Sequence, residues 1–210
     1  MSNAQHSPGQ LYVISAPSGA GKTSLISSLL HTVDNLVMSI SYTTRAPRAL
    51  ETHGIDYFFV SDIEFKEMQA EQLFLEQAQV FKYHYGTSKE WVEKTLAKGK
   101  DIVLELDWQG HRSIKALYPD AMGIFILPPS KETLAHRLNG RGQDDPEVIL
   151  HRMQQASDEI SHYNEYDYII VNHDLKIATE EVASIIQAAR LSLSRQQIEQ
   201  AELITSLLPS

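Results

Sequence analysis

Short runs of apolar residues recur along the chain, and the stretches between them are long enough for helices. The first run, residues 11–15 (LYVIS), is rich in branched and aromatic residues and leads into proline and glycine. Short, mostly apolar runs are typical of strands buried inside a parallel sheet. The pattern predicts a strand there and further strands at residues 102–106, 123–127 and 168–171.

The segments between these runs carry apolar residues at helical spacing. Residues 22–31 place Leu25, Ile26, Leu29 and Leu30 on one face of an amphipathic helix. Comparable patterns predict helices at residues 89–98, 131–138 and 147–159 and a long C-terminal helix from residue 177. Because strands and helices alternate, we expect an α/β fold with a parallel core sheet covered by helices on both faces.

Two segments interrupt this alternation. Residues 39–87 are rich in Thr, Tyr, Arg and Phe, and the pattern at 56–60 predicts a short antiparallel strand. We expect residues 39–87 to form an inserted region of mixed α/β structure. Residues 140–146 (GRGQDDP) hold no core-forming side chain and lie between two helical patterns, which predicts a mobile loop within a separate region at residues 131–155. The core would then comprise residues 10–38, 88–130 and 156–210.

Composition excludes several classes of protein. With 210 residues, 42% of them hydrophobic, the chain can bury one compact core. A net charge of −9 argues against a nucleic-acid polymer as partner, because binding a polyanion requires a basic face. The chain has no cysteine and therefore no disulfide or Cys-ligated metal. It also lacks a secretory signal and a long apolar stretch, so we expect a cytoplasmic protein without a membrane partner.

The segment after the first strand carries the most specific motif. It matches the phosphate-loop (P-loop) pattern except at its first glycine, and its residues are Ala16, Pro17, Ser18, Gly19, Ala20, Gly21, Lys22 and Thr23. Glycines let backbone N–H groups turn toward phosphate oxygens, and the following helix presents its N-terminus to the same anion. Lys22 can reach the β- and γ-phosphates of a bound nucleotide, and the Thr23 hydroxyl can ligate Mg²⁺.

The alternative is a glycine-rich turn that contains Gly-Lys by chance. The expected strand before the motif and the helix after it favour a phosphate site, since phosphate loops occur in that context. The motif leaves the second substrate open, because phosphate loops serve switch GTPases, motor ATPases and small-molecule kinases. A switch GTPase would also carry an N/T-K-x-D motif, which the sequence lacks.

Candidate groups for a second substrate lie within residues 39–87. Arg45 and Arg48, with Pro47 stiffening the chain between them, suit a dianionic phosphate because arginine makes bidentate contacts with phosphate oxygens. Further members of the segment are Glu51, Gly54, Asp56, Tyr57, Glu76, Tyr83, His84, Tyr85 and Thr87. Each alone is better explained as a solvated charge or a core aromatic, but together they indicate a binding region.

Two carboxylates, Glu105 and Asp107, alternate at the end of an expected strand and would share the face opposite Leu104 and Leu106. Carboxylates there are costly unless they meet a cation, a ligand or water. One interpretation places them near Mg²⁺-ATP and the second substrate, with metal contact through water and Asp107 the more direct participant. The other interpretation is a structural salt bridge to Lys22 or to a neighbouring arginine.

Three arginines within residues 131–155 are candidates for a phosphate site. Arg137 and Arg141 lie four residues apart, and Arg152 returns from the next helix. Phosphoryl transfer needs no covalent nucleophile from the protein; it needs positioning and positive charge around the transferring oxygens. An ion pair with a nearby acidic residue such as Asp144 or Asp145 is the alternative for any one of them.

Motifs in order along the chain resemble the guanylate kinase family. They are S-x-S-x-T-T-R-x-P-R from Ser39, E-x-x-G-x-D-Y-x-F, F-L-E-x-A, Y-G-T, L-E-L-D-x-Q-G at 104–110, P-P-S at 128–130, R-L-x-x-R-G at 137–142 and V-N at 171–172. The resemblance extends from Gln10 to about Arg190. It implies a three-layer P-loop kinase fold with an inserted GMP-binding region and a mobile lid at residues 131–155, which would carry Arg137, Arg141 and Arg152 over the phosphates. It also implies transfer of the γ-phosphoryl group of ATP to GMP with Mg²⁺.

The same resemblance implies roles for individual residues. Those that would hold the GMP phosphate are Arg45, Arg48, Tyr57 and Tyr85. Those that would read the guanine or lie beside GMP are Ser41, Glu76, Thr87 and Asp107. Asn172 would approach the adenine of ATP; His173 follows it, where the family often has aspartate. Guanine offers N1–H and N2–H₂ as adjacent donors to one ionised carboxylate at Glu76, whereas adenine offers no such pair.

Two other classes of protein compete with this hypothesis. Guanylate-kinase-like domains of scaffold proteins share the fold and bind peptides, but they can lose the phosphate-loop lysine and the GMP clamp, which stand here as Lys22, Arg45 and Arg48. A P-loop kinase with another acceptor would not need the guanine-reading residues. The C-terminal helix leaves a homo-oligomer open, since it could pack against a second copy of the chain or against its own core.

Overall fold

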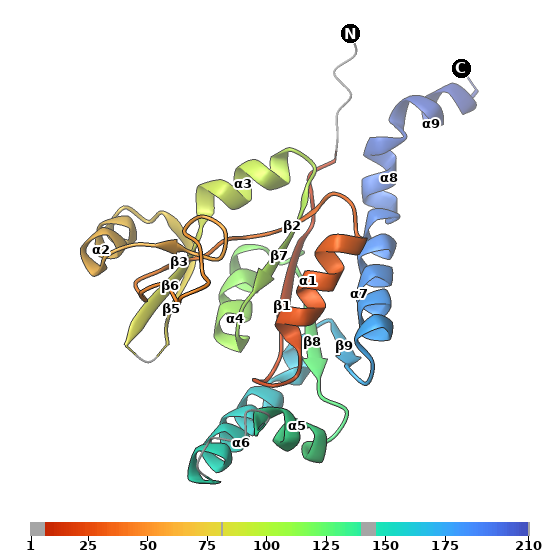
Figure 1. Cartoon of the computed structure of the whole chain (residues 1–210). Helices are drawn as coiled ribbons and strands as arrows, with labels where there is room; N and C mark the ends of the chain where they lie inside the picture. The colour runs from red at the N-terminus through yellow and green to blue at the C-terminus, as the bar shows by residue number, and fades with distance from the viewer. Residues whose placement is uncertain (1–6, 81, 140–145, 210) are drawn as a thin grey trace.

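The structure, a computed structural model, describes residues 7–80, 82–139 and 146–209. At its centre is a five-stranded sheet in the order β2-β7-β1-β8-β9 (Figure 1). Its strands are β1 (Leu11–Ser15), β2 (Leu36–Met38), β7 (Asp101–Glu105), β8 (Met122–Leu127) and β9 (Tyr168–Val171). Each pair of neighbours is parallel, so the carboxyl ends of all five strands lie along one edge of the sheet.

Helices cover both faces of this sheet. They are α1 (Lys22–Thr32) and α7 (Leu175–Arg190) on one face, and α3 (Lys89–Ala97) and α4 (Trp108–Leu117) on the other. Successive side chains of β1 alternate between the two cores, because side chains of a strand point to opposite faces. Tyr12 and Ile14 pack with α1 and α7, whereas Leu11 and Val13 pack with α3 and α4. The predicted three-layer α/β fold is confirmed.

The four predicted core strands are present, with ends shifted by at most one residue. The sequence patterns did not predict β2 or α4. The long C-terminal helix predicted from residue 177 is present as α7, but it ends at Arg190, and the chain continues as two short helices, α8 (Leu193–Glu199) and α9 (Ala201–Leu207). The backbone of Ser192 (φ −58°, ψ 147°) lies outside the helical region and interrupts the helix after α7.

The inserted region builds a second sheet in the order β4-β3-β6-β5. Its elements are β3 (Tyr42–Thr43), β4 (Phe58–Phe59), α2 (Asp62–Ala70), β5 (Phe74–Val80) and β6 (Tyr83–Ser88). The antiparallel strand predicted at 56–60 is wrong in length and direction, since β4 has two residues and pairs parallel with β3. The connection through residues 44–57 carries the chain back before β4 begins.

The two helices of the expected lid are α5 (Lys131–Leu138) and α6 (Pro146–Ser161). They pack on each other through Leu134, Leu138 and Ala156, apart from the two main cores. The loop predicted as mobile lies outside the described residues, except for Pro146, which begins α6. After α6, a short 3₁₀ helix, η1 (Tyr163–Glu165), leads into β9.

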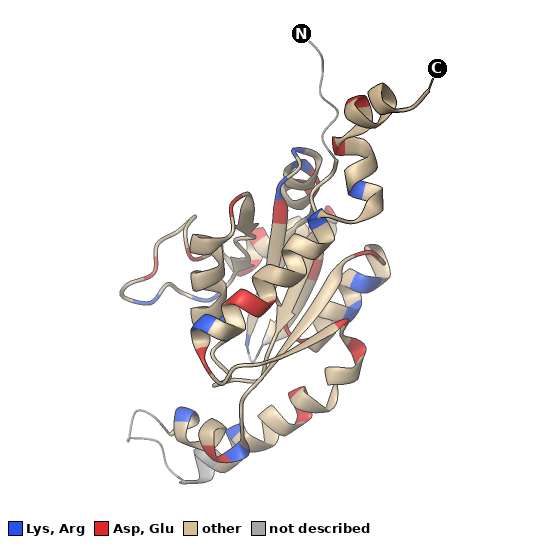
Figure 2. Cartoon of the chain, turned by 90° about the vertical axis from the view of Figure 1, so that its right-hand side faces the viewer, with Lys and Arg blue, Asp and Glu red and all other residues tan. Residues whose placement is uncertain are grey.

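Helices α8 and α9 lie at the end of the molecule opposite α5 and α6 (Figures 1 and 2). Acidic and basic positions are interspersed along the helices that Figure 2 shows. Within the described part of the chain, no helix combines the length and the apolar character needed to span a membrane.

One buried carboxylate ties the C-terminal helices to the central sheet. Asp101, at the start of β7, is 0% exposed. Its Oδ2 accepts a hydrogen bond from Arg190 Nε at 2.8 Å, and its Oδ1 accepts from Arg195 Nη1 at 3.0 Å and from the Gln10 backbone N–H at 2.7 Å. Buried charges are tolerated when they are paired and hydrogen-bonded in this way.

Replacing Asp101 with alanine leaves two arginines without their buried partner. We therefore expect Asp101→Ala to lower the free energy of unfolding by about 3–5 kcal/mol, the range for breaking a buried ion pair. Urea denaturation measures this, with Glu90→Gln as the control because the Glu90–Lys94 pair on α3 is exposed. The control should unfold at nearly the wild-type urea concentration; equal midpoints for Asp101→Ala and wild type would contradict the proposed anchoring.

Candidate active site

The phosphate loop, residues 16–21, connects the carboxyl end of β1 to the first turn of α1. Gly19 and Gly21 have φ values of 86° and 92°, in the left-handed region that residues with a Cβ rarely adopt. The Ala20 N–H donates to the Pro17 carbonyl oxygen at 3.0 Å and closes the turn. The loop thus lies at a helix N-terminus, where backbone N–H groups can face an anion.

A polar contact holds the back of this loop. Asn172 is 4% exposed, follows β9, and donates from Nδ2 to the Ala20 carbonyl oxygen at 2.8 Å. A Cβ on Gly21 would lie 2.5 Å from the same nitrogen, so a side chain at position 21 would displace Asn172. Arg137 reaches the carbonyl oxygens of Ala20 and Asn172 at 3.4 Å each. The contact of Asn172 with adenine stays a prediction; the contact seen is with the loop.

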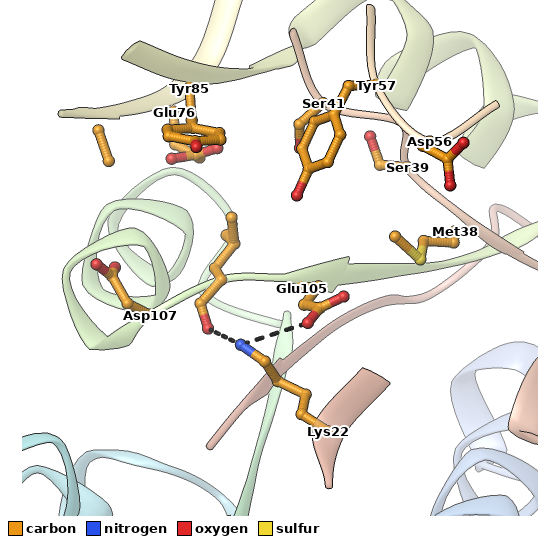
Figure 3. A pocket seen from close by; sticks show the side chains of 12 residues that line it. Lys22, Met38, Ser39, Ser41, Asp56, Tyr57, Glu76, Tyr85, Glu105 and Asp107 are labelled. Atoms are coloured by element: carbon orange, nitrogen blue, oxygen red, sulfur yellow. Dashed lines mark hydrogen bonds and ion pairs between the residues drawn. The ribbon is translucent and has the colours of Figure 1, made fainter. Parts of the chain in front are cut away.

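The phosphate cavity lies beside this loop and is also lined by Glu105, Arg137 and Glu159. Lys22 Nζ lies 3.8 Å from Glu105 Oε1 and 3.5 Å from the Leu106 carbonyl oxygen (Figure 3). Thr23 Oγ1 donates to the same Glu105 oxygen at 3.3 Å. The salt bridge to Lys22, one of the two interpretations of Glu105 from sequence, is therefore present.

A second cavity, the acceptor cavity, adjoins the first and opens between the core and the inserted sheet. Lys22 and Glu105 line both cavities, so they stand at the boundary between them. The residues given a role with GMP by the family resemblance that also line this cavity are Ser41, Tyr57, Glu76, Tyr85 and Asp107, and Asp56 of the candidate segment lines it as well. Figure 3 shows Tyr57, Tyr85 and Glu76 on the inserted side, across the cavity from Lys22 and Glu105.

Glu76 is a buried carboxylate on β5 that aims into the acceptor cavity. It is 7% exposed, and Thr87 Oγ1 on the neighbouring strand β6 donates to its Oε1 at 2.7 Å. The pKa of Glu76 is raised to about 7, mainly by burial; the Thr87 hydrogen bond opposes this rise and the negative charge of Asp107 adds to it. Thr87 is itself fully buried and does not line the cavity, so it holds Glu76 in place.

The two arginines of the predicted phosphate clamp differ in their surroundings. Arg45 Nη2 pairs with Glu51 Oε1 at 2.8 Å, and its guanidinium lies 5.4 Å from the centre of the Tyr57 ring. The hydrogen bond to Glu51 raises the pKa of Arg45 above its usual value. The Arg48 side chain is 78% exposed, and Nη1 lies 4.0 Å from Glu51 Oε1. Neither arginine is among the residues that line the acceptor cavity.

The sequence predicted that Asp107 shares a strand face with Glu105, and this prediction is wrong. Strand β7 ends at Glu105, and Asp107 is the N-cap of α4, where its Oδ1 accepts from the Gly110 N–H at 2.8 Å. An aspartate at this position satisfies a backbone donor that the first helical turn leaves unpaired. Asp107 and Glu105 still line one cavity, because the chain turns into α4 directly beside the end of the strand.

The predicted lid arginines are only partly described. Arg137, on α5, lines the phosphate cavity. Arg152, on α6, is exposed and donates to the Leu138 carbonyl oxygen at 3.4 Å. Arg141 lies outside the described residues.

Comparisons with known proteins identify the family. The pattern of the guanylate kinase family matches residues 8–189. The guanylate kinase of Saccharophagus degradans is 54% identical over 200 residues, which cover 95% of this chain and 98% of the relative. That of Nitrosomonas europaea is 55% identical over 194 residues, which cover 92% and 96%. The chain belongs to the guanylate kinase family. A crystal structure of guanylate kinase from Anaplasma phagocytophilum has a TM-score of 0.76 and 31% identity, covering 96% of this chain and 98% of that one.

One charged residue that lines the site of this guanylate kinase family member was not predicted from sequence. Glu159, on α6, lines the phosphate cavity and accepts a hydrogen bond at its Oε2 from the Ser18 backbone N–H at 3.1 Å. It belongs to none of the motifs that carry the family resemblance. The available signal was its spacing of two helical turns from Arg152, which places both residues on one face of α6.

The raised pKa of Glu76 predicts a stability that depends on pH. Between the unfolded pKa of 4.5 and the folded value of about 7, the folded chain binds the additional proton, so stability falls as pH rises through this window. Glu76→Gln lacks this loss. Its free energy of unfolding relative to wild type should increase by up to about 3 kcal/mol between pH 5 and pH 8. Urea unfolding at both pH values measures the change; an unchanged difference would contradict the buried, proton-binding carboxyl.

Proposed function

We propose that this guanylate kinase family member transfers the γ-phosphoryl group of ATP to GMP and releases ADP and GDP, which returns GMP to purine nucleotide metabolism in the cytoplasm. One observation carries the proposal: the phosphate cavity and the acceptor cavity meet at Lys22 and Glu105. Two nucleotides in these cavities would place their phosphates at that boundary. Such positioning is the main requirement of phosphoryl transfer between two bound substrates.

On the donor side, the loop amides and two cations would hold the phosphates of ATP. The backbone between Ala16 and Thr23 supplies the N–H groups, with Asn172 holding the loop from behind. Lys22 and Arg137 supply positive charge within the cavity, and Arg141 and Arg152 would add to it from the lid. Fixed positive charge stabilises the charge that spreads over the transferring oxygens in the transition state.

The donor set beside Lys22 fits Mg²⁺. Thr23 Oγ1 and Glu105 Oε1 are oxygen ligands 3.3 Å apart, and Mg²⁺ prefers oxygen ligands. The described residues include no group of three or more His, Asp or Glu side chains placed for a metal. Thr23 would therefore bind the ion directly, with Glu105 or Asp107 reaching it through water and the phosphates completing its shell. Bound there, Mg²⁺ would neutralise charge on the β- and γ-phosphates.

On the acceptor side, the ionised Glu76 carboxylate would accept hydrogen bonds from guanine N1–H and N2–H₂. Thr87 keeps the carboxylate oriented, and Ser41 offers a hydroxyl on the same side of the cavity. Adenine has no matching pair of donors, so its binding would leave a buried charge unpaired. The Glu76 side chain, held by Thr87, would thereby distinguish the guanine of GMP from adenine.

The residues proposed for the GMP phosphate are Arg45, Arg48, Tyr57 and Tyr85, with Asp107 beside the nucleotide. Tyr57 and Tyr85 already line the cavity, and the Arg45 guanidinium lies over the Tyr57 ring. Arg48 would turn in from solvent, exchanging its distant contact with Glu51 for a phosphate oxygen. Residues 39–87 then act as the GMP-binding region, residues 131–155 as the lid, and the remainder as the core.

The test is an ADP-release assay with Mg²⁺-ATP and GMP, AMP, CMP or UMP. We expect turnover with GMP. Lys22→Ala should lower kcat at least about 100-fold, because it removes the positive charge that stabilises the transferring phosphoryl group. Glu76→Ala should raise the KM for GMP and narrow the preference for GMP over AMP. The control, Lys94→Ala at an exposed position of α3, should retain wild-type turnover. No turnover from protein that binds GMP would instead support a binding module.

A further inference from the structure

The phosphate loop is in contact with both helices of the lid. A Cβ placed on Gly19 would lie 3.0 Å from a methyl group of Leu138 and 3.1 Å from one of Leu134, so α5 packs directly on the loop. The next contact is polar and comes from α6: Glu159 Oε2 accepts from the Ser18 N–H at 3.1 Å. These two residues are 141 positions apart in the sequence. A carboxylate from the C-terminal part of α6 therefore occupies a backbone donor of the loop.

The Ser18 N–H belongs to the group of donors that serves phosphate in the proposed function. A carboxylate and a phosphate oxygen make the same kind of charge-assisted hydrogen bond to such a donor. The two anions cannot share it, and a carboxylate left beside a bound phosphate would repel it. The Glu159 carboxylate thus accepts the Ser18 hydrogen bond that a phosphate oxygen would otherwise accept.

The charges that line the phosphate cavity also indicate that Glu159 disfavours a bound phosphate. The described side chains that line it include two cations, Lys22 and Arg137, and two carboxylates, Glu105 and Glu159. Glu105 can serve a metal ion beside Thr23, which gives its charge a use when nucleotide binds. Glu159 interacts with Lys22 and is half-buried, and burial raises its pKa. The negative charge of Glu159 repels an incoming phosphate, and the proposed reaction gives this charge no role.

We propose that Glu159 competes with nucleotide phosphate for the Ser18 amide and thereby lowers the affinity of the enzyme for ATP and ADP. The inference rests on the proposed function, since it assumes that the loop takes nucleotide phosphates. Coupling between two binding events is reciprocal. Phosphate at the loop therefore displaces Glu159 and weakens the attachment of α6, the helix that also carries Arg152.

A merely structural role for Glu159 predicts the opposite sign. If the carboxylate served to hold the loop in the shape that binds phosphate, its removal would weaken nucleotide binding. If it competes, its removal strengthens binding. The sign of the change in ADP affinity therefore separates the two roles.

The experiment is calorimetric titration of the full chain with ADP, and separately with GMP. Glu159→Gln keeps the size of the side chain and removes its charge, and Glu159→Ala removes the acceptor as well. We expect ADP to bind at least about threefold more tightly to Glu159→Gln and about tenfold more tightly to Glu159→Ala, the order of one lost charge-assisted competitor. Asp158→Asn, the exposed neighbour on α6, is the matched control and should change ADP affinity by less than about twofold.

Affinity for GMP should stay within about twofold of wild type in all variants, because Glu159 does not line the acceptor cavity. Unchanged or weaker ADP binding by Glu159→Gln overturns the inference, and this variant decides the matter if Glu159→Ala unfolds. Tighter ADP binding by Asp158→Asn to the same extent would also overturn it, since any loss of negative charge on α6 would then suffice. Wild-type protein that binds no ADP would overturn the proposed function itself.

Discussion

The positive φ angles of Gly19 and Gly21 are the constraint on which the site depends. They allow the chain leaving β1 to present its amides toward one point at the N-terminus of α1. The order of the sheet then brings other groups to the same place. Strand β7, beside β1, ends at Glu105, and β9, two positions away on the other side, leads into Asn172 behind the loop. Parallel strands thus collect residues from distant parts of the sequence at one edge.

The buried carboxylate of Glu76 in the acceptor cavity lowers the stability of the free protein, and the proposed chemistry explains why it is there. Glu76 is buried within reach of the negative charge of Asp107, it accepts a hydrogen bond from the Thr87 hydroxyl, and its pKa is raised. A carboxylate in such a place is poorly satisfied until a ligand supplies donors. Guanine supplies two such donors, N1–H and N2–H₂, side by side on one edge of the base. The strain on Glu76 in the free protein and the proposed selectivity for GMP therefore have one physical origin.

The local parts of this account follow from sequence, and the long-range parts do not. The phosphate loop and β1 were predictable because the motif and the apolar run are contiguous. Helix α4 was not, since the buried residues on its inner face are Gly110, His111 and Ile114, which give a weak apolar pattern. The parallel pairing of β4 and the contact of Glu159 with Ser18 depend on how distant segments meet. No spacing along the chain encodes such contacts.

The most direct test of the account is the affinity for GMP of wild type and Glu76→Gln, measured by calorimetry at pH 6 and pH 8. Taking the ratio of the two proteins removes the titration of the GMP phosphate, which both share. Because the carboxyl of Glu76 has a pKa of about 7 and must be ionised to accept from guanine, the wild-type advantage should grow about tenfold over this range. A ratio that stays constant between pH 6 and pH 8 would contradict recognition of guanine by the ionised Glu76 carboxylate.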